Sequence, residues 1–197
     1  MPDLNEARLH KLGNQLPGRL SMPGDDRYVA ATTIWAKPSG AMPRAVVRCR
    51  TAQDVQSAIR AVRDCDLPLS VRGGGHDWAG RALCDGIVID LSGMNSVVIE
   101  PATRTAQISG GARAGDVVDA ADPLGLAPVT GSVGTVGMTG LTLGGGYGPL
   151  IGRFGLALDN LIAAVVVLAD GRIVVATADY DRDLFGRCGA AVETSES

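Results

Sequence analysis

The sequence predicts an α+β protein with two subdomains, and three observations support this prediction. Apolar residues make up 46% of the 197-residue chain, which is enough to build a sizeable core. Two apolar runs, at 45–49 and 67–71, flank a segment whose apolar residues recur at helical spacing, which is typical of a strand–helix–strand unit. Further along, Asp170-Gly171 separates the apolar runs 161–168 and 173–175, which is a strong hairpin signal. We therefore expect an N-terminal subdomain built on the first unit and a second subdomain with a mixed sheet.

The helix of the first unit is predicted to begin after Thr51 and to end before Pro68. Asp54 follows Thr51 by three residues, as in a capping box. The runs 67–71 and 87–91 both read as buried strands. Other expected elements are paired strands at 97–99 and 105–109 with a turn at Pro101, and a helix at 114–124 with Val117, Val118 and Ala121 inward. Residues 1–30 show little regular pattern beyond a weak helical start.

Composition excludes several classes of partner. The formal net charge is −3 and there are no basic clusters, so nucleic acid is not an expected partner. There is no apolar run long enough to span a bilayer, and the polar start of the chain does not resemble a signal peptide, so we expect a cytoplasmic protein with no membrane partner. The four cysteines are widely scattered without a CxxC pair, which predicts neither a metal site nor a disulfide framework.

The first candidate site is the glycine-rich loop Arg72-Gly73-Gly74-Gly75-His76, which follows the apolar run 67–71. Three consecutive glycines allow close approach of the backbone, and their amides can form a nest for an anion, with Arg72 beside it. His76 lies at the exit of the loop. This arrangement favours a phosphate-bearing cofactor with His76 near its reactive end. The alternative is a glycine turn at the end of a strand with a surface histidine.

The second candidate site is the glycine-rich segment Thr130–Gly148. Glycines recur every third residue from Gly131 to Gly140, which would let the backbone lie flat against a ligand, and several hydroxyl side chains lie among them. The segment lacks the Gly-Lys-Ser/Thr of a Walker A loop and the acidic partner of the Rossmann pattern, so neither a kinase nor a nicotinamide enzyme is supported. The alternative is a glycine-rich turn with a packed short helix.

Four motifs taken together resemble a known family: Arg72–His76, Gly131–Gly148, Arg153–Asn160 and Ala169–Arg172. Their order and spacing are similar to those of the FAD-linked oxidases of the vanillyl-alcohol-oxidase superfamily, and in particular its berberine-bridge-enzyme-like branch. The resemblance runs from about residue 45 to residue 185. It implies a PCMH-type FAD-binding domain made of two α/β subdomains, with FAD as cofactor.

The resemblance also implies roles for individual residues. The first loop would bind the FAD pyrophosphate, and His76 would be joined covalently to the 8α-methyl carbon of the flavin. The other residues implied in cofactor binding are Arg72, Gly73, Gly74, Gly75, Thr130, Gly131, Gly134, Thr135, Gly137, Met138, Gly140, Leu141, Gly144, Gly145, Tyr147, Asn160 and Val166. No residue of this chain is assigned a catalytic role.

Four of these positions, and Val133 in the second segment, carry a more specific expectation. Val133 stands where some relatives place a second, cysteinyl link, so we expect a single histidyl attachment. Leu141 stands where some relatives place a histidine near the flavin. Tyr147 is expected to line the cofactor, the alternative being a core tyrosine. Asn160 is expected to fix loop geometry, the alternative being a simple turn residue. The backbone around Val166 would face the adenine, while Asp77 and Trp78 are interpreted as surface residues.

The function implied by the resemblance is oxidation of an alcohol, sugar or amine carbon, with hydride transfer to covalently bound FAD and O₂ as the expected acceptor. The substrate would be a small molecule. The alternative is a catalytically inactive FAD-binding fragment without the substrate domain. A reductase of peptidoglycan precursors is a weaker alternative, because those enzymes bind FAD noncovalently and His76 argues against them.

The sequence after Phe185 departs from the family. Relatives continue Trp-Ala-Leu-Arg-Gly-Gly-Gly-Gly-Asn-Phe-Gly-Val-Val-Thr, and one set of codons for that segment, read after loss of a single T, encodes residues 186–197 and then a stop. We therefore expect residues 186–197 to be a frameshifted, disordered tail. The expected layout is an N-terminal extension at 1–40, an FAD-binding domain at 41–185 with subdomains at about 41–100 and 101–185, and no substrate domain.

Overall fold

The computed structural model describes residues 4–36 and 40–190. The chain divides into two compact units. Unit 1 comprises Met1–Met94 and Val167–Arg172, and unit 2 comprises Asn95–Val166 and Ile173–Ser197. The division falls a few residues before the boundary predicted near residue 100. The short segment Val167–Arg172 belongs to unit 1 although its neighbours in the sequence belong to unit 2, which the sequence did not predict.

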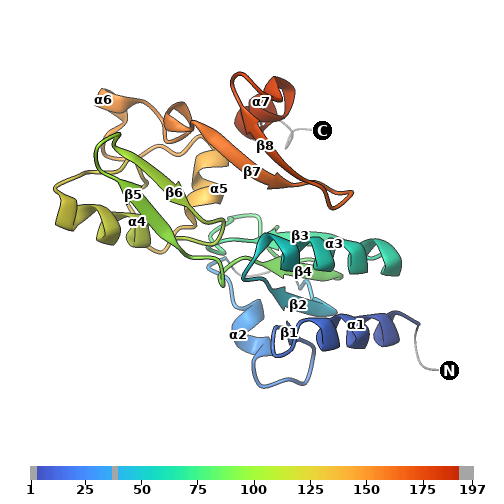
Figure 1. Ribbon diagram of the computed structural model, residues 1–197. Coiled ribbons are helices and arrows are strands. Elements are labelled where there is room, and N and C mark those ends of the chain that lie inside the picture. The colour runs from blue at the N-terminus through green and yellow to red at the C-terminus, as the bar shows by residue number, and fades with distance from the viewer. Residues whose placement is uncertain (1–3, 37–39, 191–197) are drawn as a thin grey trace. The chain divides into compact units, whose positions relative to one another are not determined.

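Unit 1 is built on a four-stranded sheet in the order β1-β2-β4-β3 (Figure 1). Its strands are β1 (Leu20–Ser21), β2 (Ala45–Arg48), β3 (Leu69–Arg72) and β4 (Ile87–Asp90). The last three are parallel to one another, and β1 is antiparallel to β2. The predicted strand–helix–strand unit is present, but β4 lies between its two strands. All four residues of β4 are buried, as predicted for this run, and the strand is central in the sheet.

Strand β3 differs from its prediction as a fully buried strand, because it lies at the edge of the sheet. Ser70 points inward and its hydroxyl donates a hydrogen bond to the carbonyl of Ala82 at 3.2 Å. The alternating side chains of Leu69 and Val71 point outward and are 42% and 54% exposed. A continuous apolar run does not distinguish a central strand from an edge strand, since both faces look apolar in the sequence.

Helices α1 (Leu4–Gln15) and α3 (Ala52–Cys65) pack against each other and contribute to the main core of unit 1. The third helix of the unit, α2 (Tyr28–Thr32), packs near β2. The core contains Leu9, Leu12 and Leu16 from the N-terminal segment, Val55, Ala58, Ile59 and Val62 from α3, and Ala45, Val47, Ile87 and Ile89 from the sheet. The N-terminal segment therefore contributes to the core of unit 1. Its signal was the three- and four-residue spacing of its leucines, which is short and interrupted by charged residues.

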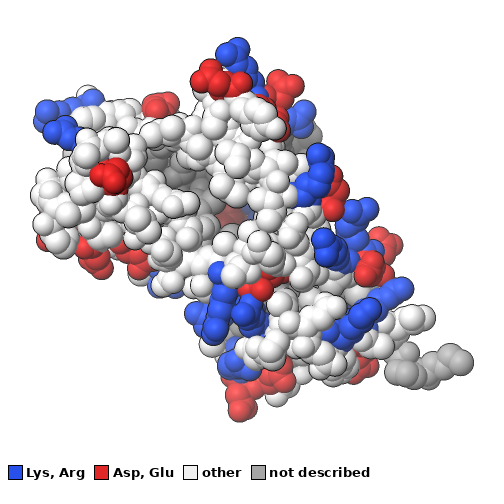
Figure 2. Space-filling view, in the orientation of Figure 1, with Lys and Arg blue, Asp and Glu red and all other residues white. Residues whose placement is uncertain are grey.

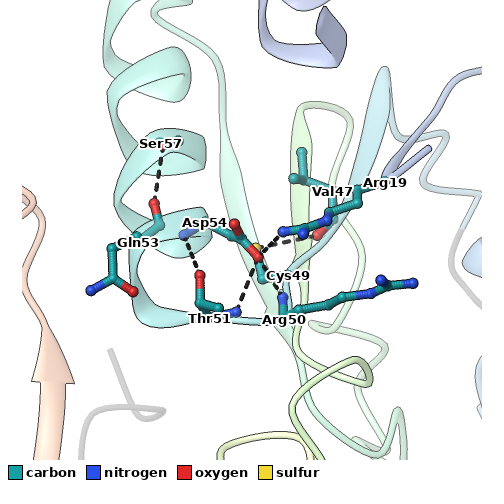
Figure 3. A network of polar contacts seen from close by, with 8 residues as sticks. All are labelled: Arg19, Val47, Cys49, Arg50, Thr51, Gln53, Asp54 and Ser57. Carbon is teal, nitrogen blue, oxygen red and sulfur yellow. Dashed lines mark hydrogen bonds and ion pairs between the residues drawn. The ribbon is translucent and has the colours of Figure 1, made fainter. Parts of the chain in front are cut away.

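The predicted capping box at the start of α3 is present and is part of a larger polar network (Figure 3). The Thr51 hydroxyl accepts from the Asp54 amide at 3.2 Å, and the Asp54 carboxylate accepts from the amides of Arg50 and Thr51 at 2.8 and 3.0 Å. Arg19 forms an ion pair with the same carboxylate. Burial alone would raise the pKa of Asp54, but these hydrogen bonds and the Arg19 charge lower it below its ordinary value. The network ties the N-terminal segment to α3.

Unit 2 contains two small sheets in place of the single mixed sheet predicted. Strands β5 (Val97–Glu100) and β6 (Thr105–Ile108) pair antiparallel, and β7 (Ala163–Val167) pairs with β8 (Ile173–Thr177) across the predicted turn. Helix α4 (Ala114–Ala121) continues into a 3₁₀ turn at Asp122–Leu124. The remaining elements are the helices α5 (Met138–Leu143), α6 (Ile151–Phe154) and α7 (Arg182–Ala190) and the 3₁₀ turn Leu158–Asn160.

The core of unit 2 is formed by Val117, Met138 and Ala157, with Val97, Ile108 and Leu141 packed against them. Val117 and Ala121 face inward as predicted, but Val118 is 42% exposed, so its predicted position is wrong. Successive residues lie about 100° apart around a helix, so the buried face formed by Ala114, Val117 and Ala121 leaves Val118 at its border.

Helix α7 packs against β8 and α5. It runs through Gly186–Ala190, so the prediction of disorder is wrong for residues 186–190, while residues 191–197 lie outside the described part of the chain.

Charged side chains of both signs are interspersed on the face shown in Figure 2, and few lie over β5 and β6. In the part of the chain that the structure describes, no helix is both long and apolar enough to cross a membrane.

Candidate cofactor site

The first glycine-rich loop leaves the carboxyl end of β3, the end of a parallel sheet where ligands usually bind. Gly75 has φ +70°, a left-handed conformation that favours glycine, and the residue is buried. Among the residues that the structure describes, the amides of Gly73, Gly74 and Gly75 contact no hydrogen-bond acceptor. Three consecutive amides without acceptors, one of them in a buried residue, fit a bound anion such as a phosphate group.

The Arg72 side chain lies close to Gly75 and reaches the end of α2. Its guanidinium donates to the carbonyl of Thr33 at 3.0 Å and to the carbonyl of Ala31, so it holds the end of α2. Its Nε is buried and has no partner among the described residues. A Cβ on Gly75 would lie 3.3 Å from that Nε. The structure therefore assigns Arg72 to supporting the loop, and its direct contact with the cofactor remains only a prediction.

His76 belongs to a small aromatic cluster. Its imidazole stacks on the indole of Trp35, with ring centroids 5.8 Å apart and an interplanar angle of 17°. Trp78 contacts the same indole edge-on, with centroids 4.8 Å apart. Trp35 and Trp78 are 57% and 84% exposed, so the cluster lies at the surface of unit 1. Trp35 was not predicted as a site residue, although it is one of only two tryptophans in the chain.

The turn after His76 is fixed by Asp77. Its carboxylate accepts from the backbone amide of Arg81 at 2.7 Å and from the Arg81 guanidinium at 2.8 Å. The hydrogen bonds from the Arg81 side chain lower the pKa of Asp77 against the opposing effect of burial. His76 is thus held between a glycine loop on one side and a hydrogen-bonded turn on the other.

The second glycine-rich segment packs on the start of α4. Gly115 donates to the carbonyl of Gly134 at 2.9 Å, and a Cβ on Gly115 would lie 3.1 Å from that oxygen, so the two backbones approach closely. Val136 accepts from Ala114 at 2.9 Å. Within the described residues, the amides of Gly131, Ser132, Val133 and Gly134 contact no acceptor, and Ser132–Thr135 is exposed. Like the first loop, this segment presents a run of amides that can bind an anion.

The segment also contributes to the core of unit 2. Thr130 is 6% and Met138 7% exposed, and Gly137 is also buried, so their side of the segment faces inward. Gly140 lies on the opposite side, in α5, and a Cβ there would have no atom within 4 Å. Leu141 packs in the core, close to Gly131. The expected cofactor residues of this segment therefore fall into a buried set and an exposed set.

The end of the segment, Gly144–Gly148, forms a tight turn. Gly145 and Gly146 have φ values of +87° and +73°, and their carbonyls accept from Leu158 and Ala157. Tyr147 is 77% exposed, which rules out the alternative of a core tyrosine.

Two further expected residues lie beyond this turn. The side-chain amide of Asn160 donates to the carbonyls of Phe154 and Leu156 at 3.0 and 2.8 Å, so Asn160 fixes the loop before it. Val166 lies in β7.

A pocket of about 370 Å³ opens in unit 2 beside the second glycine-rich segment. Its lining comprises Val118 and Asp122, residues 126–128 and 130–132, and Pro149 and Leu150. Thr130, Gly131 and Ser132 belong both to this lining and to the glycine-rich segment. In the part of the chain that the structure describes, no cluster of His, Cys, Asp or Glu could hold a metal ion.

Comparison with known proteins identifies the class to which this arrangement belongs. Residues 43–177 match the FAD binding domain family, and the chain belongs to that family. It is 40% identical over 171 residues to (R)-6-hydroxynicotine oxidase of Paenarthrobacter nicotinovorans. The match covers 86% of this chain and 37% of that protein.

Two solved structures show the same fold. The berberine-bridge-enzyme-like protein 1 of Physcomitrella patens superposes with a TM-score of 0.87 at 29% identity, covering 91% of this chain and 40% of that one. The carbohydrate oxidase of Microdochium nivale, in complex with a substrate analogue, superposes with a TM-score of 0.86 at 30% identity, covering 96% of this chain and 40% of that one.

These findings confirm three predictions made from the sequence: the family of FAD-linked oxidoreductases with its berberine-bridge-enzyme-like members, the PCMH-type α/β fold, and FAD as cofactor. The relatives themselves are named as oxidases and FAD-linked oxidoreductases. The chain spans about two fifths of the length of these relatives.

Proposed function

We propose that this chain binds FAD through its two glycine-rich segments and that the protein oxidises a small molecule by FAD-dependent hydride removal. The observation that carries the proposal is the pair of amide runs without acceptors, at Gly73–Gly75 and Gly131–Gly134, in a chain of the FAD binding domain family. Oriented backbone amides bind phosphate oxygens without adding charged side chains. The pyrophosphate of FAD has the matching chemistry.

We further propose that His76 carries FAD covalently, through a bond from an imidazole nitrogen to the 8α-methyl carbon of the flavin. The bond replaces one methyl C–H and the imidazole N–H, so two protons leave. Two electrons remain on the flavin and pass to O₂, which becomes hydrogen peroxide. Support comes from the place of His76 at the exit of the anion-binding loop, in an exposed aromatic cluster. The exposed Val133 offers no thiol for a second link.

The covalent link is tested by acid precipitation of the protein loaded with FAD. Wild-type protein is expected to keep its yellow colour in the precipitate, because acid unfolds the chain but does not break the carbon–nitrogen bond. His76→Ala is expected to release all of its flavin into the supernatant, and His10→Ala, which removes the only other histidine, is expected to behave as wild type. Wild-type protein that releases its flavin would rule out the link.

For the reaction itself, we propose oxidation of an alcohol, sugar or amine carbon, with hydride transfer to the flavin and O₂ as acceptor. Among the relatives, one is named as a hydroxynicotine oxidase and one as a carbohydrate oxidase. The protein supplies binding and orientation, and the flavin supplies the redox chemistry.

The competing proposal is an FAD-binding fragment without turnover, since the match to the FAD binding domain family concerns cofactor binding and not a substrate. Oxygen consumption by FAD-loaded protein with a panel of alcohols, sugars and amines separates the two proposals. Flavin that is bound but is not reduced by any substrate favours the fragment.

A further inference from the structure

The stacked pair Trp35–His76 has no role in the proposed binding of FAD by backbone amides. Because Trp35 is 57% exposed, its indole is not held there by burial in the core. It nevertheless lies nearly parallel to the imidazole, at 17° and 5.8 Å between centroids, which is within the range of favourable offset stacking. An exposed tryptophan against the one histidine of the glycine loop calls for an explanation.

The backbone places Trp35 independently of its side chain. The amide of Trp35 donates to the carbonyl of Gly75 at 2.9 Å, directly before His76. The preceding residues are held by the Arg72 guanidinium, which binds the carbonyls of Ala31 and Thr33. Ile34 packs against a second buried cluster on the sheet, with Val46 and Val88. Trp35 and the segment before it are therefore anchored at four points, three on the loop and one on the sheet, and none of them involves the indole.

We infer that Trp35 is a positioning residue for His76, holding the imidazole plane in the orientation that its bond to the flavin requires. The inference rests on the proposed covalent attachment. A histidine side chain can rotate about two bonds, and the reacting nitrogen must be aimed at one carbon. Stacking on an anchored indole is worth about two- to tenfold in favour of one orientation. Displacing a reacting group by a small distance from its productive position slows a bond-forming step by about tenfold or more.

Trp78 provides a matched control. The Trp78 side chain is 84% exposed, which is more than that of Trp35. It contacts the Trp35 indole edge-on and does not stack on the imidazole. Removing its indole takes away the same kind of side chain from the same cluster without removing the stack. Trp35→Phe is the conservative variant, because it keeps a flat ring at the same anchored position.

The experiment measures covalent incorporation of FAD over time. Wild type, Trp35→Ala, Trp35→Phe and Trp78→Ala are mixed with FAD under air, quenched in acid at intervals, and assayed for flavin fluorescence in the denatured chain. We expect Trp35→Ala to incorporate about tenfold or more slowly than wild type. Trp35→Phe and Trp78→Ala should stay close to wild type, and noncovalent FAD binding, measured before the quench, should be unchanged in all four.

A second measurement needs no flavin. Diethyl pyrocarbonate modifies imidazoles, and the chain contains only His10 and His76, whose modification is separated by mass spectrometry after digestion. His10 lies on the exposed face of α1 beside Glu6 and serves as the internal reference. In the FAD-free protein, Trp35→Ala should increase the modification rate of His76 relative to His10, because one face of the ring becomes accessible.

The two measurements separate the possible failures. Wild-type protein without covalent flavin would overturn the proposed attachment, and with it the role of Trp35 in that step. Wild-type incorporation with an unchanged rate in Trp35→Ala would overturn the inference alone. Slow incorporation in Trp35→Phe as well as Trp35→Ala would also overturn it, because a flat ring would then not be sufficient. Unchanged reactivity of His76 toward the reagent in Trp35→Ala would show that the stack does not control the ring.

Discussion

Glycines of the second glycine-rich segment differ in whether the structure leaves room for a side chain. A Cβ on Gly148 would lie 1.9 Å from the carbonyl oxygen of Thr130, a contact that real structures do not show. A Cβ on Gly140 would meet no atom within 4 Å. The sequence presents both as members of one glycine-rich run, but only the folded structure shows that Gly148 is required for packing and that Gly140 faces open space.

We expect Gly148→Ala to lower the free energy of unfolding by about 1–3 kcal/mol or more, because the backbone of Thr130 must move. The matched variant Gly140→Ala should leave stability unchanged or raise it by about 0.5–1 kcal/mol, since alanine is favoured over glycine inside a helix. Urea unfolding of the two variants measures both effects. Equal stability of the two variants would contradict the close approach of Gly148 to Thr130.

At the scale of elements, the sequence predicted helices and strands well where a local signal fixes them. The capping box at Thr51 and Asp54 marked the start of α3, and Asp170-Gly171 marked the turn between β7 and β8. Prediction from the sequence failed where the burial of an element depends on contacts with residues far away in the chain. The exposure of β3 follows from its place at the edge of the sheet. The core role of α1 follows from its packing on α3, which its short leucine pattern did not indicate.

The buried network at the start of α3 predicts a pH-dependent contribution to stability. Hydrogen bonds and the Arg19 ion pair lower the pKa of Asp54 in the folded protein, so its stabilisation is complete above the unfolded pKa of about 3.9. It is lost as the pH falls through the lower folded pKa. Asp54→Asn should therefore be less stable than wild type at neutral pH, by about 1 kcal/mol or more for the lost cap, and the difference should shrink in acid.

The control for this prediction is Asp64→Asn, the same substitution at an exposed position of the same helix. Guanidinium unfolding at several pH values measures the difference between each variant and wild type. A deficit in Asp54→Asn that stays constant from neutral pH to well below the unfolded pKa would mean that the carboxylate charge does not provide the stabilisation.

At the scale of the whole molecule, the sequence predicted the class of fold, the two glycine-rich segments and the cofactor, because motifs at several positions agree in order and spacing. It did not predict that the segment Val167–Arg172 belongs to unit 1, where Val167 packs against the core and the Gly171 carbonyl accepts from the Gln56 side chain. It also missed Trp35, whose contact with His76 joins positions forty-one residues apart in the chain. Such contacts depend on tertiary packing and leave no periodic signal.

The central claim is that His76 carries FAD, and trypsin provides the most direct measurement. Cleavage after Arg72 and Arg81 releases the peptide Gly73–Arg81, which contains His76 and no other histidine. From FAD-loaded protein, this peptide should show flavin absorbance and a mass increased by FAD less two hydrogens, with fragmentation placing the addition on the histidine. An unmodified Gly73–Arg81 peptide, with all flavin recovered free after denaturation, would contradict the claim.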